Sequence, residues 1–190
     1  RTNEAYKKIK KLTNGSVLSI DVFGKNWGLA SNSIHFVDLL SFLSGRTDLE
    51  FDINGLSKNS LKSKRAGFQE LQGFIKVKSY FGDKLLMSDE LKNEDTLTVK
   101  IENDVNSIII NEETGYYLEK KQNEKSNKLP FKSKFQSELT GKIVDQIINS
   151  NDCELTKYDE CIKYHIPMIE AFNSHFTKTL NKKINACPIT

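Results

Sequence analysis

The stretch Thr96-Leu97-Thr98-Val99-Lys100-Ile101 decides the fold, because polar and apolar side chains alternate along its whole length. Such alternation is typical of a β-strand that buries one face and exposes the other. Residues 74–78 repeat the pattern, and residues 108–110 and 116–118 add further apolar or aromatic runs. Turn signals separate these segments at hairpin spacing, at Gly82-Asp83, Asn103-Asp104 and Glu113-Thr114-Gly115. The region of residues 49–118 is therefore predicted to be a mostly antiparallel meander.

Helical periodicity lies on both sides of this block. The sequence predicts a short helix around residues 6–12, a strand over residues 16–22 and a second helix that ends at Gly45. Residues 120–128, rich in Lys and Asn, are predicted to be a mobile connection. Two closing helices are predicted, one over residues 133–149 and one that begins at Thr156. Because strands and helices are segregated along the chain, we predict an α+β domain, with helices packed on one face of an open sheet.

Length and composition narrow the possible functions. A chain of 190 residues can bury one sizeable core, which favours a single domain. The 28 Lys and Arg residues nearly balance the 25 Asp and Glu residues, so the surface is mixed in sign, which argues against a nucleic-acid partner. The three cysteines show neither disulfide-framework nor zinc spacing, so no metal site is expected. No apolar run reaches the roughly 20 residues that a membrane span needs, and we predict a cytoplasmic protein with no membrane partner.

A helix over residues 31–40 carries the residues best suited to chemistry. His35 would lie in its first turn, where the helix dipole favours a neutral imidazole that can hydrogen-bond a hydroxyl or exchange its proton. Ser31, one turn earlier, can face the same solvent pocket. From the residues alone, His35 can also be read as a half-buried helix histidine with a satisfied ring nitrogen, and this is the commoner case. Asp38 either braces the imidazole from three residues on or is an ordinary helix residue.

The segment Gly28–Gly45 resembles the Gly-rich segment of the Gfo/Idh/MocA oxidoreductases, a group that includes glucose-fructose oxidoreductase and inositol dehydrogenase. That segment reads Asp-x-Gly-x-His-x-x-Asp-Leu and closes on Leu-x-Gly. The residues that match it here are His35, Asp38, Leu39 and Gly45. The similarity covers most of the chain, and its entry pattern, Arg-x-x-x-x-Tyr-x-x-x-Lys, is matched by Arg1, Tyr6 and Lys10.

The resemblance implies a two-domain enzyme. A Rossmann domain would bind NAD or NADP, and a dihydrodipicolinate-reductase-like C-terminal domain would supply the His and the substrate pocket. Residues 1–190 correspond to the second domain, because they lack a Gly-x-Gly-x-x-Gly turn after a strand and open on Arg1 rather than Met. We therefore expect a fragment that is inactive alone and whose full-length protein is an NAD(P)-dependent oxidoreductase of a sugar or sugar nucleotide. The likeness also implies polysaccharide biosynthesis and a homodimer or homotetramer formed through the sheet.

The same likeness assigns roles to individual residues. His35 is expected to be the catalytic residue that exchanges the proton of the substrate hydroxyl, together with a lysine of the missing domain. The candidates for substrate binding are Ser31, Asn32, Trp27, Asp38 and Lys76. Trp27 either stacks on a sugar ring or packs in the core. Lys76 either binds a phosphate or carboxylate of the substrate or keeps the sheet soluble.

Two departures from the family pattern bear on the mechanism. Ser31 stands where the family usually has an acidic residue, four before the His, and Ser33 stands where it usually has Gly. The helix therefore lacks a proton-relay carboxylate, and Asn32 can position a hydroxyl but cannot take its proton. The rival hypothesis is a non-catalytic module that uses the same sheet to bind a sugar or to assemble with another protein.

Overall fold

The sheet is built by the alternation seen in the sequence. In β5 (Gly73–Ser79), Ile75 and Val77 are buried while Lys76 and Lys78 are exposed, so one face of the strand joins the core. The computed structural model describes the whole chain except residues 60, 95 and 190. The other strands are β1 (Ser19–Gly24), β2 (Leu49–Asp52), β3 (Leu61–Lys62), β4 (Gln69–Glu70), β6 (Lys84–Asp89), β7 (Thr98–Glu102), β8 (Asn106–Asn111), β9 (Tyr116–Lys121) and β10 (Asn127–Pro130).

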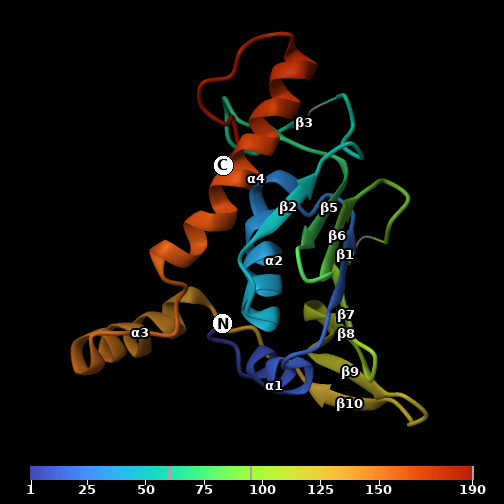
Figure 1. The fold of residues 1–190 in the computed structure, drawn as a ribbon, viewed down its shortest axis with the longest axis vertical. Coiled ribbons are helices and arrows are strands. Elements are labelled where there is room, and N and C mark those ends of the chain that lie inside the picture. The colour runs from blue at the N-terminus through green and yellow to red at the C-terminus, as the bar shows by residue number, and fades with distance from the viewer. Residues whose placement is uncertain (60, 95, 190) are drawn as a thin grey trace.

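Eight of these strands form one sheet in the order β10-β9-β8-β7-β1-β6-β5-β2 (Figure 1). The central strand β1 pairs in parallel with β6 and antiparallel with β7. The other neighbouring pairs in this sheet are antiparallel. The short strands β3 and β4 pair only with each other among the described residues. The predicted mostly antiparallel sheet is therefore confirmed.

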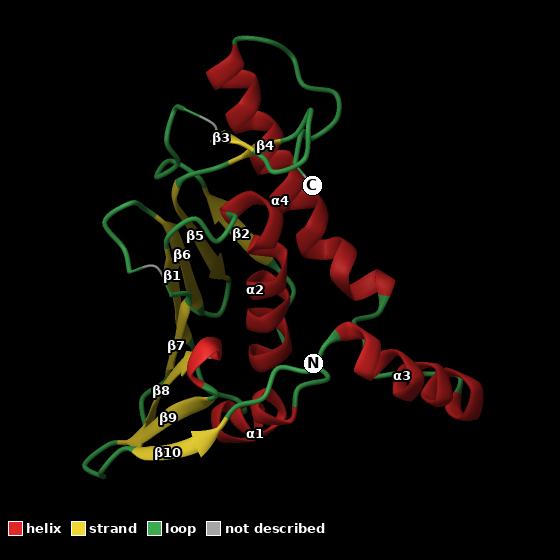
Figure 2. Ribbon diagram, turned by 180° about the vertical axis from the view of Figure 1, so that it is seen from behind, coloured by secondary structure: helices red, strands yellow, loops and turns green. Residues whose placement is uncertain are grey.

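The helices lie on one face of the sheet. They are α1 (Glu4–Thr13), α2 (Leu29–Ser44), α3 (Gln136–Ser150) and α4 (Tyr158–Leu180), and a 3-10 turn, η1, spans Glu112–Thr114. Figure 2 shows α1, α2 and α4 on the same side of the large sheet, whereas the opposite face carries no helix of the described chain. The predicted α+β architecture, an open sheet with helices on one face, is confirmed.

The core lies between the sheet and two of these helices. On α4, the aromatic side chains of Tyr164, Phe172 and Phe176 are fully buried, and they belong to the same hydrophobic cluster as buried leucines of α2 such as Leu40 and Leu43. Burial of one such side chain stabilises the fold by about 1.5–3 kcal/mol. Because α4 also contacts β2, this packing fixes α2 between α4 and the sheet.

Two segments depart from this compact arrangement. Helix α3 projects away from the body of the molecule and has no buried residue. The prediction of a mobile connection over residues 120–128 is wrong at both ends, because β9 continues to Lys121 and β10 begins at Asn127. β10 lies at the edge of the sheet, where polar side chains are tolerated on both faces, so it needs no apolar alternation. No helix of the described residues is long and apolar enough to cross a membrane.

Candidate functional site

The start of α2 is the structural basis of the candidate site. Gly28 precedes the helix with a φ of 81°, and no side chain of its own caps the first amides. Two carboxylates from other strands do so instead. Asp89, at the end of β6, accepts hydrogen bonds from the Asn26 amide at 2.6 Å and the Gly28 amide at 3.2 Å. Glu70, at the end of β4, accepts from the Ala30 amide. The beginning of α2 is thus tied to β4 and β6.

Electrostatics at this helix end are set by the two carboxylates together. Burial raises the pKa of Asp89, and the nearby charge of Glu70 raises it further, whereas hydrogen bonds from the Asn26 and Gly28 amides act in the opposite direction. The helix dipole favours negative charge at this end. The carboxylates therefore stabilise the helix start while they repel one another.

Two adjoining cavities open beside this helix end. One, of about 510 Å³, is lined by residues that include Ser31, Glu70 and Asp89. The other, of about 450 Å³, is lined by residues that include His35 and Asp38. The side chains shared by both cavities are those of Trp27 and Asn32. The structure thus brings together five of the six residues singled out from the sequence.

Trp27 and Asn32 are held firmly in the wall between the cavities. The indole Nε1 of Trp27 donates to the Ser88 carbonyl at 2.9 Å, and its ring meets Phe36 edge to face at a centroid distance of 5.4 Å. The amide nitrogen of Asn32 donates to the carbonyls of Trp27 at 2.7 Å and Gly28 at 3.2 Å. Part of the indole is accordingly packed, as one reading of the sequence proposed, and the same ring also lines both cavities.

His35 is exposed and lies one helical turn after Ser31. Residues four apart on a helix share a face, with Cβ atoms roughly 5–6 Å apart, so the imidazole and the Ser31 hydroxyl border the same side of α2. On α4, burial lowers the pKa of His165, and the nearby charge of Asp38 acts in the opposite direction.

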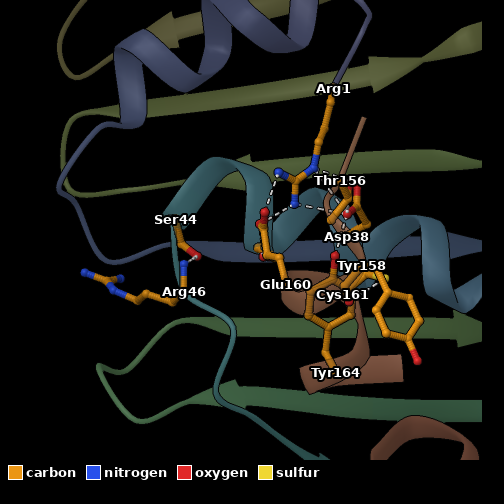
Figure 3. Close-up of polar contacts among 10 residues, drawn as sticks. Arg1, Asp38, Ser44, Arg46, Thr156, Tyr158, Glu160, Cys161 and Tyr164 are labelled. Atoms are coloured by element: carbon orange, nitrogen blue, oxygen red, sulfur yellow. Dashed lines mark hydrogen bonds and ion pairs between the residues drawn. The ribbon is translucent and has the colours of Figure 1, made fainter. Parts of the chain in front are cut away.

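Asp38 is occupied by a network that ties α2 to the start of α4 (Figure 3). Its Oδ1 accepts hydrogen bonds from the hydroxyls of Thr156 and Tyr164, both at 2.6 Å, and from Arg1 Nη2 at 3.1 Å. The same guanidinium donates to Glu160 Oε1 at 2.6 Å. Burial by itself raises the pKa of Asp38, but these three hydrogen-bond donors outweigh it and lower the pKa. In the described chain the side-chain hydrogen bonds of Asp38 run to Thr156, to Tyr164 of α4 and to Arg1, and none runs to His35.

Two residues show where sequence reasoning and structure diverge. Lys76 is exposed on the face of β5 that points away from α2, with its Nζ 5.3 Å from the centroid of the Phe74 ring. It is thus not brought to either cavity. Glu70 was not among the candidates, because it lies in a stretch without apolar periodicity, and no local signal marks its approach to α2.

Comparison with known proteins finds solved structures that share the fold of this chain. No protein-family model and no curated protein matches the sequence. Among solved structures, a dehydrogenase, MviM, from Clostridium difficile superposes with a TM-score of 0.57 at 16% identity, over 89% of this chain and 58% of its own. KijD10, a 3-ketoreductase from Actinomadura kijaniata solved with NADP, gives 0.53 at 13% identity, over 87% and 53%. The UDP-N-acetylglucosamine 3-dehydrogenase GnnA from Acidithiobacillus ferrooxidans gives 0.53 at 9% identity, over 96% and 56%.

These solved structures are all oxidoreductases, and part of each has the same fold as the chain. The chain spans little more than half of the length of each of them. At such low identity the likeness concerns the fold, and it agrees with the family pattern seen around His35. We conclude that the chain has the fold of the C-terminal domain of Gfo/Idh/MocA-type oxidoreductases.

Proposed function

We propose that this chain is the substrate-binding domain of an NAD(P)-dependent oxidoreductase that acts on a hydroxyl or carbonyl group of a sugar or sugar nucleotide. The observation that carries the proposal is the pair of adjoining cavities at the start of α2, one lined by Ser31, the other by His35, and both by Trp27 and Asn32. An aromatic face with a few convergent polar groups is the usual composition of a small-molecule site. Solved oxidoreductases with the same fold support it.

The residues of this chain would bind the sugar and handle a proton. Trp27 offers a ring face for stacking, and Ser31 and Asn32 offer polar atoms to hydroxyl groups. His35, exposed at the helix face, exchanges the proton of the reacting hydroxyl. The nicotinamide would supply the hydride acceptor or donor.

The start of α2 does not fit the pyrophosphate of a dinucleotide. Helix N-termini bind phosphate through unpaired amides, but here Glu70 and Asp89 already accept from those amides and would repel an anion. The proposal therefore assigns the phosphates of NAD or NADP to a separate Rossmann domain. On this reading the chain by itself is inactive.

The rival proposal is a binding or assembly module without turnover. It is favoured by the engagement of Asp38 with Thr156 and Tyr164, which leaves His35 without the carboxylate brace expected from the sequence. In either proposal, the helix-free face of the sheet is the surface through which copies of the chain would form a dimer or tetramer.

The test uses the full-length protein and the variant His35→Ala. Turnover is followed by nicotinamide absorbance with NAD and NADP and with UDP-N-acetylglucosamine, UDP-glucose and D-glucose. Loss of general acid–base catalysis lowers kcat by about 10²–10⁴-fold, so we expect a drop of this order for His35→Ala. His165→Ala, an exposed histidine of α4, is the matched control. Wild-type turnover that survives in His35→Ala would remove His35 from the mechanism, and sugar binding without any turnover would favour the module.

A further inference from the structure

Glu70 controls the hydroxyl of Ser31. Ser31 Oγ lies 2.5 Å from Glu70 Oε2, and the other carboxylate oxygen, Oε1, accepts from the amides of Ala30 and, at 3.0 Å, Leu71. A carboxylate has no proton to give, so Ser31 must be the donor in their hydrogen bond. The orientation of the Ser31 hydroxyl is therefore set by a residue from β4.

This hydrogen bond determines whether Ser31 donates a hydrogen bond to a ligand or accepts one from it. A serine hydroxyl has one proton and two acceptor positions. Because its proton is given to Glu70, Ser31 meets any further group as an acceptor. A ligand group at this point of the cavity must therefore carry a proton, as a sugar hydroxyl does and a carbonyl, ether or fluorine does not.

The charged groups around Glu70 are consistent with this assignment. Asp89 of β6 shares the helix end, and Lys62, Lys64 and Arg65 line the same cavity from the β3–β4 side. A carboxylate at this position lies at the positive end of the α2 dipole. Ser31 lies one turn before His35 on α2, and its cavity adjoins the one that His35 lines.

We infer that Glu70 is a positioning residue that makes Ser31 an obligate hydrogen-bond acceptor, and that this pair selects ligands with a free hydroxyl at one ring position. The inference rests on the proposed function, because it names what that same cavity recognises. It concerns binding alone, so it can be tested apart from turnover.

The variant Glu70→Gln makes the sharpest test. The amides of Ala30 and Leu71 continue to hold the side-chain carbonyl oxygen, so the new NH₂ group faces Ser31 Oγ and donates to it. The Ser31 proton must then turn away from residue 70, so that Ser31 becomes able to donate to a ligand group. The substitution thus changes Ser31 from a hydrogen-bond acceptor into a donor toward the ligand, with almost no change in the shape of the site.

Binding is read from the fluorescence of Trp27, the single tryptophan of the sequence, which lines both cavities. The ligands are UDP-glucose and D-glucose, each with its monodeoxy and monodeoxyfluoro analogues. For the wild-type chain we expect one ring position at which deoxy and deoxyfluoro analogues both bind about tenfold more weakly, the equivalent of one hydrogen bond. In Glu70→Gln, the fluoro analogue at that position should bind at least as well as the parent sugar. Ser31→Ala should abolish the discrimination.

Controls separate this role from a purely structural one. Glu90→Gln removes a neighbouring carboxylate that lies on neither cavity, and it should keep the wild-type preference. Circular dichroism verifies that each variant is folded. An unchanged preference in a folded Glu70→Gln protein overturns the role of Glu70 alone. The absence of a response to either sugar series in the wild-type chain overturns the proposed function, and this inference with it.

Discussion

Replacement of Asp38 by Asn tests whether this residue is a structural tie rather than a ligand of the substrate. Asp38 accepts from Thr156, Tyr164 and Arg1, and its side chain is 27% exposed while that of Arg1 is 14% exposed. In Asp38→Asn the carbonyl oxygen still accepts from the two hydroxyls, but without charge, and the ion pair with Arg1 is lost.

The expected loss follows from the kinds of bond that change. Hydrogen bonds to a charged group contribute about 1.5–3 kcal/mol each, against about 1 kcal/mol for neutral bonds. Partial exposure screens the Arg1 pair. We therefore expect Asp38→Asn to lower the free energy of unfolding by about 2–3 kcal/mol, which for a chain of this size corresponds to a decrease in Tm of about 4–12 °C.

Urea unfolding at neutral pH, followed by Trp27 fluorescence and far-UV circular dichroism, measures this loss. The partner variant Tyr164→Phe removes a single hydroxyl donor, and the double variant closes a cycle in which we expect a coupling of about 1–2 kcal/mol. A loss below about 0.5 kcal/mol in Asp38→Asn, the level of an exposed ion pair, would refute the reasoning. Weakened sugar binding with unchanged stability would instead make Asp38 a ligand of the substrate.

Two further predictions concern pH and backbone geometry. Burial lowers the pKa of His175, whose Nε2 is buried without a partner in the described chain, so the unfolded state takes up a proton more readily. The free energy of unfolding should be constant above about pH 6.5 and fall as the pH drops below it, and His175→Gln should flatten this fall in urea titrations. Stability that rises on acidification would contradict this. Gly28→Ala should cost about 1–3 kcal/mol, because φ is +81° and the added Cβ would lie 2.9 Å from Asn32 Nδ2. Gly141→Ala, with open space around the new Cβ, is the control and should not destabilise.

Much of the fold could be predicted from local pattern. Alternation identified β5 and β7, and helical periodicity identified α2 and α4, because in each the buried face is set by spacing within one element. The parallel pairing of β1 with β6 left no such trace, since it joins Ser19 to Lys84 across a helix and four strands. β10 was missed because an edge strand needs no apolar face.

The candidate site was predictable only where it lies on one element. Ser31, Asn32 and His35 share the first turns of α2, so their proximity follows from helix geometry. The partners that decide their roles come from distant segments. Glu70 reaches Ser31 from β4, and Tyr164 reaches Asp38 across 126 positions of the chain. Such contacts are fixed by tertiary packing, which single-sequence patterns do not encode.

The central position of β1 has a consequence for how the chain reaches its native state. Its two neighbours, β6 and β7, follow it by more than sixty residues, at Lys84–Asp89 and Thr98–Glu102. Until β6 has been synthesised, the strand that becomes the middle of the sheet has two open edges, and it keeps one open edge until β7 follows. Open edges are templates for pairing with other chains. The slow, non-local step of folding is therefore the capture of β1, and a nascent chain that stops before β6, with both edges of β1 open, is the form most exposed to aggregation.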